Sequence, residues 1–266
     1  MKLNWEYIKD VGFIKWFYRT AIRQFYQRVL RRGLWIRLPN GLRYYCPIND
    51  KAASEAYVMK GLVDWGAELK MLEYLDSNSV AIDIGARTGL YSLMMGSAAN
   101  QVIAFEPDPV PFRYLENYAK KYTWLKPMNV AISNFSGSTT LKQNANGFTL
   151  IGNKEGPTQV ITIDQFAKPG RVGFIKIDID TFDLDAIEGA YETVKKDKPV
   201  ILTELDSRET ERLYSICADL GYTVSGYFRR DYDSKPFWVE DISRQALDRI
   251  IYKMLFLKPK EVENKA

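Results

Sequence analysis

Short apolar runs alternate with amphipathic stretches through the middle of the chain. Runs rich in Val, Ile and Leu predict buried strands, and the segments between them repeat apolar residues at three- and four-residue steps, which predicts helices. The expected strands are 79–86, 101–107, 128–133, 172–179 and 199–205, and the expected helices are 89–99, 108–122, 184–196 and 208–222. Because such alternation forms right-handed βαβ units, we expect a mostly parallel sheet with helices on both faces.

The two ends of the chain carry other patterns. Helical periodicity over residues 3–32 predicts one helix or two short ones that end near Gly33, and Asn40-Gly41 predicts a hairpin turn within 34–47. The remaining expected elements are a helical region over 51–75, strands near 223–228 and 237–240, an amphipathic helix over 243–255 and a charged, flexible tail over 258–266. We therefore expect a helical arm and hairpin (1–50), a large domain (51–257) and the tail.

Positive charge is concentrated in the N-terminal arm. Residues 1–43 contain ten Lys or Arg and two acids, a net charge of +8, which leaves −4 for the rest because the whole chain carries +4. The apolar side of the arm consists of Ile8, Val11, Ile14, Phe17, Ala21, Phe25 and Val29. Three roles stay open: packing on the domain, contact of residues 1–33 with a membrane surface or acidic partner, or a lid over the substrate.

Composition excludes several classes of protein. The 266 residues include no histidine, which excludes a Ser-His-Asp triad, a histidine base and a histidine-rich metal site. Cys46 and Cys217 lie far apart in the sequence, which suits a reducing compartment. No stretch reaches the ~18 consecutive apolar residues of a transmembrane helix, and from the polar and charged first residues we expect no secretory signal. We expect a cytoplasmic protein, with peripheral membrane contact as the alternative.

The first strand-to-helix turn is a candidate ligand site. It reads AIDIGARTGLYSL, with Asp83 near the strand end and Gly85 and Gly89 on either side of a tight turn. Glycine lets a backbone approach a ligand closely, and the helix N-terminus offers free N–H groups. The spacing differs from the G-x-G-x-x-G dinucleotide fingerprint, which disfavours an NAD-dependent oxidoreductase.

A carboxylate follows the second predicted strand. Glu106, before Pro107, lies about twenty residues after the glycine turn, where an acid accepts hydrogen bonds from ribose hydroxyls in nucleoside cofactor sites. The alternative for an acid here is a helix N-cap, for which Asp108 is the better candidate.

The fourth predicted strand carries charges where a buried strand is normally apolar. Lys176, Asp178 and Asp180 recur at every second position and are expected on one face. They form either an ion pair that neutralises buried charge or a ligand site. Together with Glu204, Asp178 and Asp180 are also candidate ligands for a divalent metal, which we do not favour.

Several motifs follow one another along the chain: AIDIGARTGLYSL, VIAFEPDPVPFRYLENY, NVAIS, VITIDQF and GFIKIDIDTFDLDAIEGA followed by PVILTEL. In this order they resemble the motifs of the FkbM family of S-adenosylmethionine-dependent methyltransferases. The resemblance covers about Val80 to Leu205 and implies a Rossmann-like class I methyltransferase fold, here with an N-terminal helical extension. It also implies methylation of a hydroxyl group on a sugar, glycan or natural product, with S-adenosyl-L-methionine as the cofactor.

Carried over position by position, the resemblance implies roles for individual residues. The implied cofactor-binding residues are Asp83, Gly85, Ala86, Arg87, Gly89, Glu106, Pro107, Val130, Ala131 and Asp178. Methyl transfer to an alcohol needs a proton acceptor, and without histidine a carboxylate is the natural candidate. We predict Asp180 as the base, Asp178 as the group that orients the cofactor end, and Lys176 as the group that holds them.

Two departures from the family pattern bear on activity. Arg87 stands where the family usually has asparagine, so it either changes the turn or accepts strain, and its guanidinium is a candidate partner for the cofactor's carboxylate. Thr181 replaces a glycine and narrows the space near the substrate. A catalytically weak or inactive binding or scaffold domain is therefore the alternative function. A nucleic-acid partner is not expected, because the chain beyond residue 43 is net negative.

Overall fold

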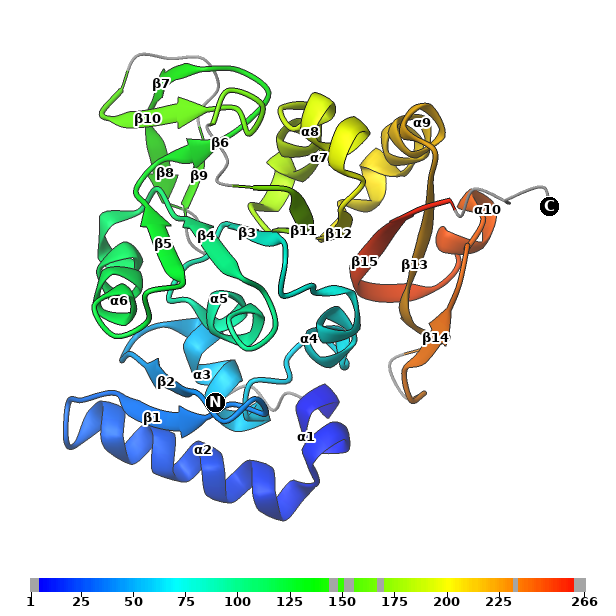
Figure 1. Cartoon of the computed structure of the whole chain (residues 1–266). Helices are drawn as coiled ribbons and strands as arrows, with labels where there is room; N and C mark the ends of the chain where they lie inside the picture. The colour runs from blue at the N-terminus through cyan, green and yellow to red at the C-terminus, as the bar shows by residue number, and fades with distance from the viewer. Residues whose placement is uncertain (1–4, 144–147, 151–155, 167–169, 232–233, 261–266) are drawn as a thin grey trace.

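The computed structural model of the chain describes residues 5–143, 148–150, 156–166, 170–231 and 234–260. Its centre is an eight-stranded sheet with the order β14-β13-β15-β12-β11-β3-β4-β5 (Figure 1). The strands are β3 (Val80–Ile84), β4 (Gln101–Phe105), β5 (Leu125–Met128), β11 (Val172–Ile177), β12 (Val200–Thr203), β13 (Tyr222–Arg229), β14 (Phe237–Val239) and β15 (Ile251–Pro259).

Strands β3, β4, β5, β11 and β12 are parallel, whereas β15 runs antiparallel to both β12 and β13. The chain moves outward from β3 to β5 on one side and from β11 to β12 on the other, so the strand order reverses between β3 and β11. Ligands of open α/β sheets bind beyond the carboxyl ends of the strands at such a reversal. The mostly parallel sheet confirms the predicted class I methyltransferase-like fold.

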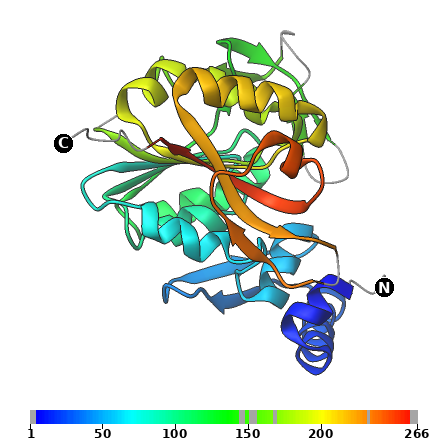
Figure 2. The ribbon, with the colours of Figure 1, turned by 90° about the vertical axis from the view of Figure 1, so that its right-hand side faces the viewer.

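Alternate residues of each strand pack into two separate cores. Ile82 and Ile84 lie in the core that also contains residues of α7, α8 and α9, whereas Ala81 lies in the other core with residues of α5 and α6. Figure 2 shows α7 to α9, in yellow and orange, above the sheet. These helices are α5 (Leu90–Met95), α6 (Pro109–Ala119), α7 (Asp183–Glu188), α8 (Tyr191–Asp197) and α9 (Thr210–Leu220).

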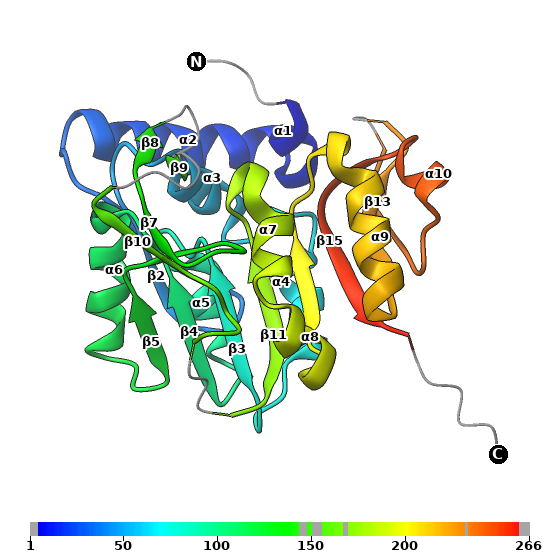
Figure 3. The ribbon, with the colours of Figure 1, turned by 90° about the horizontal axis from the view of Figure 1, so that it is seen from above.

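The N-terminal residues add a layer outside α5 and α6. It contains α1 (Trp5–Val11), α2 (Phe13–Arg28), the hairpin β1 (Leu34–Arg37) and β2 (Arg43–Cys46), α3 (Lys51–Met59), α4 (Ala67–Lys70) and the 3₁₀ turn η1 (Met71–Tyr74). Figure 3 shows α1 and α2 in blue along one side of the molecule. Of the two alternatives, one helix or two, the structure shows two, with the break at Gly12 (φ 88°), and α2 ends at Arg28 rather than at Gly33. The hairpin is also confirmed.

The third strand was predicted wrongly. Residues 125–128 form β5 at the edge of the main sheet, and after Met128 only Ala131–Ile132 of the predicted segment is a strand. This strand, β6, pairs with β10 (Thr158–Ile161), which in turn pairs with β7 (Gly137–Thr139), so the three form a separate small sheet. β8 (Leu141–Gln143) pairs with β9 (Phe148–Leu150). Pro127 argues against a strand over residues 125–128 in the sequence, because proline cannot donate a hydrogen bond to a neighbouring strand, but an edge strand tolerates proline.

The predicted helix over 243–255 was also wrong. Only α10 (Arg244–Leu247) is helical, and β15 begins at Ile251. The run from Ile251 to Leu257 is apolar enough to fit either structure by periodicity alone. It is a strand because β12 and β13 bind it on both sides. β15 also takes Lys258 and Pro259 from the predicted tail, of which 261–266 lie outside the described residues.

Candidate functional site

The loop between β3 and α5 depends on its two glycines. Gly85 has φ 74°, and a Cβ there would lie 2.1 Å from the backbone oxygen of Asp178, so only glycine lets the ends of β3 and β11 approach this closely. Gly89 has φ 88° and precedes the first residue of α5, and a Cβ there would lie 2.8 Å from Leu115. The predicted tight turn before a helix is confirmed.

Arg87 keeps the turn by adopting a left-handed backbone conformation (φ 49°). Its N–H donates to Oε2 of Glu106 at 2.8 Å, which joins the first loop to the end of β4. Its guanidinium lies 3.8 Å from Oδ2 of Asp50 at the start of α3. Of the two alternatives for Arg87, the structure therefore shows strain accepted rather than a changed turn. The contact with a cofactor carboxylate stays a prediction.

Glu106 lies buried where β4 ends. Its Oε1 accepts a hydrogen bond from the Asp108 N–H at 2.8 Å, and its Oε2 accepts the one from Arg87. Burial raises the pKa of Glu106 to about 7, partly offset by these two backbone hydrogen bonds. Asp108 caps α6 by accepting a hydrogen bond from the Val110 N–H. The prediction that Asp108, rather than Glu106, is the helix N-cap is therefore confirmed.

The loop after β5, which contains the remaining predicted cofactor residues, is joined to the end of β4 by Asn129. Asn129 donates through Nδ2 to the backbone oxygens of Glu106 and Pro107, which fixes the loop after β5 against the end of β4. Val130 and Ala131, the next two residues, are buried and lead into β6. The sequence did not single out Asn129, and its role follows only from the fold.

A buried lysine links β3 to β11. Lys176 Nζ lies 3.5 Å from Oδ1 of Asp83 and 3.4 Å from Oδ2 of Asp178, and it donates to the backbone oxygen of Gly85 at 3.2 Å. Burial disfavours the charged lysine, but the two carboxylates outweigh this effect and raise the pKa of Lys176. The ion-pair interpretation is confirmed for Asp178, and its second partner is Asp83.

The alternating pattern does not continue to Asp180. β11 ends at Ile177, and Asp180 has φ 62° and begins the 3₁₀ turn η2 (Asp180–Phe182). The expectation that Lys176, Asp178 and Asp180 share one strand face is therefore wrong for Asp180. A strand conformation cannot persist there, because η2 turns the chain directly into α7.

A cavity of about 170 Å³ lies beside the first loop. Ala86, Arg87 and Thr88 form part of its wall, and Lys176 and Asp178 form another part. Asp180 is not among the described residues that line it. Further lining residues, which the sequence did not indicate, are Tyr7, Tyr44, Glu55, Asp64, Tyr91 and Lys253.

Asp64 is the most notable of these additional residues. Its Oδ2 accepts a hydrogen bond from the Tyr91 hydroxyl at 2.7 Å, and burial raises the pKa of Asp64. Burial and repulsion from Asp64 raise the pKa of the neighbouring Glu68 to about 8. Asp64 lies in an irregular segment between α3 and α4, before the family motifs begin, so no local sequence signal marked it.

Two further acids, Asp183 and Glu204, are close enough to Asp178 for its charge to affect their pKa values. Burial, followed by repulsion from Asp178, raises the pKa of Glu204 to about 7, and burial raises that of Asp183. Within the described ranges, no group of three or more Cys, Asp or Glu side chains is arranged to hold a metal ion. The candidate ligands Asp178, Asp180 and Glu204 thus gain no support from the described geometry, and the metal, which the sequence did not favour, stays untested.

The residues around the first loop fit the predicted cofactor. Oδ1 of Asp83 is buried and accepts no hydrogen bond in the described part of the chain, although Lys176 lies nearby. A carboxylate has about four acceptor positions, so Glu106 retains capacity for hydroxyl donors beyond its two backbone partners. Four consecutive residues of the loop, from Gly85 to Thr88, line the cavity.

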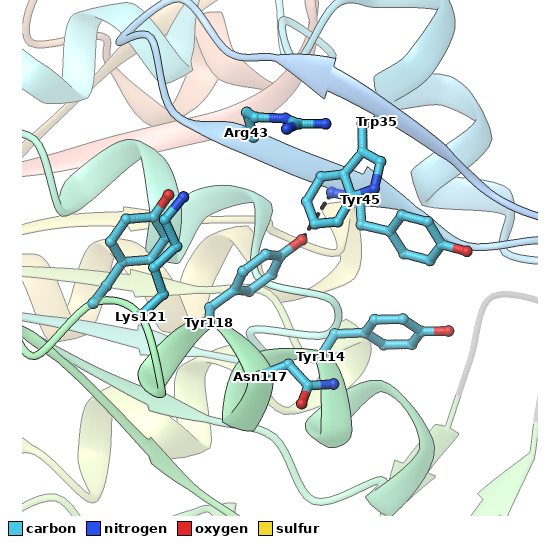
Figure 4. Close-up of a pocket in the computed structure, with 8 residues that line it drawn as sticks. Trp35, Arg43, Tyr45, Tyr114, Asn117, Tyr118 and Lys121 are labelled. Atoms are coloured by element: carbon cyan, nitrogen blue, oxygen red, sulfur yellow. Dashed lines mark hydrogen bonds between the residues drawn. The ribbon is translucent and has the colours of Figure 1, made fainter.

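A second cavity, of about 470 Å³, lies between the β1–β2 hairpin and α6 (Figure 4). The Tyr45 N–H donates to the Tyr118 hydroxyl at 2.8 Å, and the rings of Tyr45 and Tyr114 stack with centroids 5.8 Å apart. Tyr44, the neighbour of Tyr45, lines the first cavity and shares a 2.5 Å hydrogen bond with Thr88. The two cavities therefore lie on opposite faces of β2.

Comparison with known families identifies one domain. Residues 83–224, more than half of the chain, match the family described as Methyltransferase FkbM domain. No curated protein matches the chain significantly.

Several solved structures are similar to this chain. Methyltransferase FkbM from Methylobacillus flagellatus KT has 15% identity and a TM-score of 0.47, with 93% of this chain and 58% of that chain covered. Precorrin-6y C5,15-methyltransferase from Geobacter metallireducens GS-15 has 15% identity and a TM-score of 0.40, covering 73% and 86%. SMU.1697c from Streptococcus mutans, in complex with SAH, has 11% identity and a TM-score of 0.44, covering 72% and 94%. The chain thus spans little more than half of the Methylobacillus protein.

Proposed function

The chain belongs to the FkbM family of S-adenosylmethionine-dependent methyltransferases, and we propose that it methylates a hydroxyl oxygen of a sugar, glycan or other small molecule. One observation carries the choice of a hydroxyl acceptor. The carboxylate of Asp178 lies on the cavity wall directly beside the predicted cofactor loop, held by Lys176 at 3.4 Å. An alcohol must lose a proton as it is methylated, and a carboxylate at this place can accept it.

The residues of the cofactor half act by binding and orientation. S-adenosylmethionine, when bound, supplies a methyl group on a sulfonium centre. The loop from Gly85 to Gly89, Glu106, Val130 and Ala131 would hold it, with Glu106 accepting from the ribose hydroxyls. Alignment of two reacting atoms at ~3–3.5 Å can account for several kcal/mol of a reaction barrier.

Asp178 is our candidate for the proton acceptor. Its side chain keeps 36% of its surface exposed, so an acceptor hydroxyl can reach it, whereas Asp83 on the other side of Lys176 is fully buried. Lys176 orients Asp178 and compensates its charge. A positioned base contributes about 10²–10⁴-fold to a rate. Asp180, which the sequence suggested as the base, stays an untested prediction, and Asp64 is an additional carboxylate on the same cavity.

Two measurements test the proposal in sequence. Isothermal titration with S-adenosylmethionine first establishes cofactor binding, with Glu106→Gln as the variant expected to weaken it. Transfer of a labelled methyl group is then measured with a panel of hydroxylated saccharides and matched amines, with and without chelator. Methylation of amines in preference to hydroxyls would refute the oxygen acceptor, and full activity after chelation would dismiss the metal.

A catalytically weak binding or scaffold domain is the second candidate function. It is favoured by Arg87, which lies beside Asp50, and by Thr181, which lies within η2, directly after Asp180. In that case S-adenosylmethionine would not bind at millimolar concentration, or would bind without turnover with any acceptor.

A further inference from the structure

Helix α2 packs on the domain through Trp16 and Ile22 and through two arginines. Trp16 and Arg23 are its buried residues. The Arg23 guanidinium donates to the backbone oxygens of Cys46, at 2.8 Å, and Pro47, and the Arg19 guanidinium donates to the backbone oxygen of Val58 at 2.5 Å. Two arginines on successive turns thus satisfy main-chain acceptors of β2 and α3, which fixes the rotation of the helix about its axis.

This rotation leaves the apolar side of α2 facing outward. Ile14 is 82% exposed and Phe25 is 51% exposed, and Phe17, Tyr18 and Val29 are also exposed. These five residues, the outer face of α2, recur at three- and four-residue steps along one side of the helix. Of the predicted apolar side of the arm, Ile8 on α1 is buried in the core, so packing on the domain is confirmed there and is wrong only for the part of that side on α2. Contiguous exposed apolar surface of this kind marks an interaction site.

The charge around the outer face has a single sign. No acid occurs between Asp10 and Asp50, and this stretch contains eight Lys or Arg. Lys15, Arg28, Arg31 and Arg32 are exposed at the borders and the C-terminal end of the outer face. No helix in the part of the chain that the structure describes is long and apolar enough to span a bilayer. Any membrane contact through α2 is thus peripheral.

We propose that the outer face of α2 binds the surface of an anionic lipid membrane. A helix with aromatic and aliphatic residues on one side and Lys and Arg at its borders lies in the plane of the interface, with its apolar side among the acyl chains. Anionic headgroups attract the flanking cations. A protein partner or a second copy of the chain would also cover apolar side chains, but the exposed cations beside the outer face favour an anionic lipid surface.

Vesicle flotation of the full chain tests this proposal. Phosphatidylcholine vesicles with phosphatidylglycerol are compared with pure phosphatidylcholine at low and at physiological salt. We expect binding to the anionic vesicles only, weakened by salt. Replacing Phe17 and Phe25 by serine should abolish it, and replacing Arg28, Arg31 and Arg32 by glutamine should weaken it about a hundredfold. The control is Val110→Ser, an equally exposed apolar residue on α6, which should bind normally.

The alternatives give different results. Sedimentation velocity shows whether the chain self-associates, and a dimer that dissociates on Phe17→Ser would assign the outer face to a second copy and overturn the proposal. Equal binding by the serine variant and the wild type would overturn it as well. Thermal melting of every variant verifies folding, which we expect to be unchanged because the altered side chains are exposed.

We also propose, from independent observations, that the cavity between the hairpin and α6 binds an acidic saccharide. Its volume of about 470 Å³ suits a small-molecule site. Trp35, Tyr45 and Tyr114 present flat aromatic surfaces, against which the apolar face of a sugar ring can pack. Arg43 lies 5.0 Å from the centre of the Trp35 ring, and Lys121 lines the same cavity. The described lining includes two cations and no acid, which favours a carboxylate or sulfate substituent.

Titration of the full chain with a uronic-acid disaccharide and with a neutral disaccharide of the same linkage tests this site. We expect the acidic sugar to bind at least about tenfold more tightly. Arg43→Gln should remove that preference and Tyr114→Ala should weaken both sugars, whereas Phe237→Ala, on β14, should change neither. No binding at millimolar sugar, or equal binding by the Tyr114 variant, would overturn the proposal. So would tighter binding of a mononucleotide than of either sugar.

Discussion

Lys176 is buried between two carboxylates, and replacing it by methionine should strongly destabilise the protein. Its ammonium lies 3.5 Å from Asp83 and 3.4 Å from Asp178. At an effective dielectric constant of about 20, each contact corresponds to about 5 kcal/mol of attraction before desolvation. Asp178 is partly exposed and can be hydrated after the change, but Asp83 is fully buried and cannot. Loss of one partner from a buried pair costs about 3–5 kcal/mol, so we expect that loss at neutral pH.

Urea denaturation of Lys176→Met, followed by fluorescence, measures this cost. Since the carboxylates raise the pKa of Lys176 above its unfolded value, its stabilising contribution is complete at neutral pH. It is lost only as the pH rises through the folded pKa, so the deficit should be constant between about pH 6 and pH 9. Lys196→Met, on the exposed end of α8, is the matched control and should change the free energy of unfolding by less than about 0.5 kcal/mol.

A double-mutant cycle identifies the partner responsible. In the background of Asp83→Asn, the buried charge is absent, so the cost of Lys176→Met should fall by about 2 kcal/mol or more. The same cycle with Asp178→Asn should give a smaller coupling because Asp178 is solvated. The reasoning would be refuted by a Lys176→Met cost below about 1 kcal/mol, or by a cost that Asp83→Asn leaves unchanged.

Three further predictions concern the cofactor and the cavity. Gly85→Ala should lower stability by more than about 2 kcal/mol and weaken S-adenosylmethionine binding, because its Cβ would lie 2.1 Å from the backbone oxygen of Asp178. Gly221→Ala, at the similar φ of 72° but with open space, should cost only about 1 kcal/mol by chemical denaturation. Burial raises the pKa of Glu106 to about 7, so the ligand-free protein should lose up to about 3 kcal/mol as the pH rises from about 4.5 to 7. Cofactor affinity, measured by titration, should rise over the same pH range because the Glu106 carboxylate ionises there, and an affinity that does not change with pH would contradict this. Glu106→Gln should remove the pH dependence of both stability and affinity. Asp178→Asn should slow methyl transfer about 10²–10⁴-fold with cofactor affinity nearly unchanged, and a larger effect of Asp180→Asn would move the base to Asp180.

Local pattern was sufficient for the elements on which the site is built. The alternation of apolar runs and amphipathic segments predicted β3, β4, β11 and β12 and the helical segments between them, although the single helix expected over 184–196 is two helices, α7 and α8. Gly85 and Gly89 predicted the tight turn of the first loop. The distance in sequence from this turn to Glu106 predicted a carboxylate at the end of β4, and this carboxylate accepts a hydrogen bond from the Arg87 N–H. These features depend on the backbone preferences of single residues and on the spacing of residues that are close together in the sequence, so they can be predicted without knowledge of the tertiary structure.

Pairing over long distances could not be derived in the same way. β15 is a strand because it lies between β12 and β13, and β6 leaves the main sheet because β10 binds it. Asp64 reaches the cavity only through the packing of the segment between α3 and α4 against α5, where Tyr91 donates to it. None of these partners is near in sequence.

The sequence by itself determined the alternating strands and helices, the glycine loop, the acid at the end of β4 and the amphipathic character of α2. Only the tertiary structure decided that Lys176 joins Asp83 to Asp178, that Asp180 leaves the strand and that α2 turns its apolar side to solvent. Periodicity specifies which side chains share a face of an element. Which face becomes buried depends on the main-chain acceptors and side chains that other elements bring to it, as the contacts of Arg19 and Arg23 show for α2.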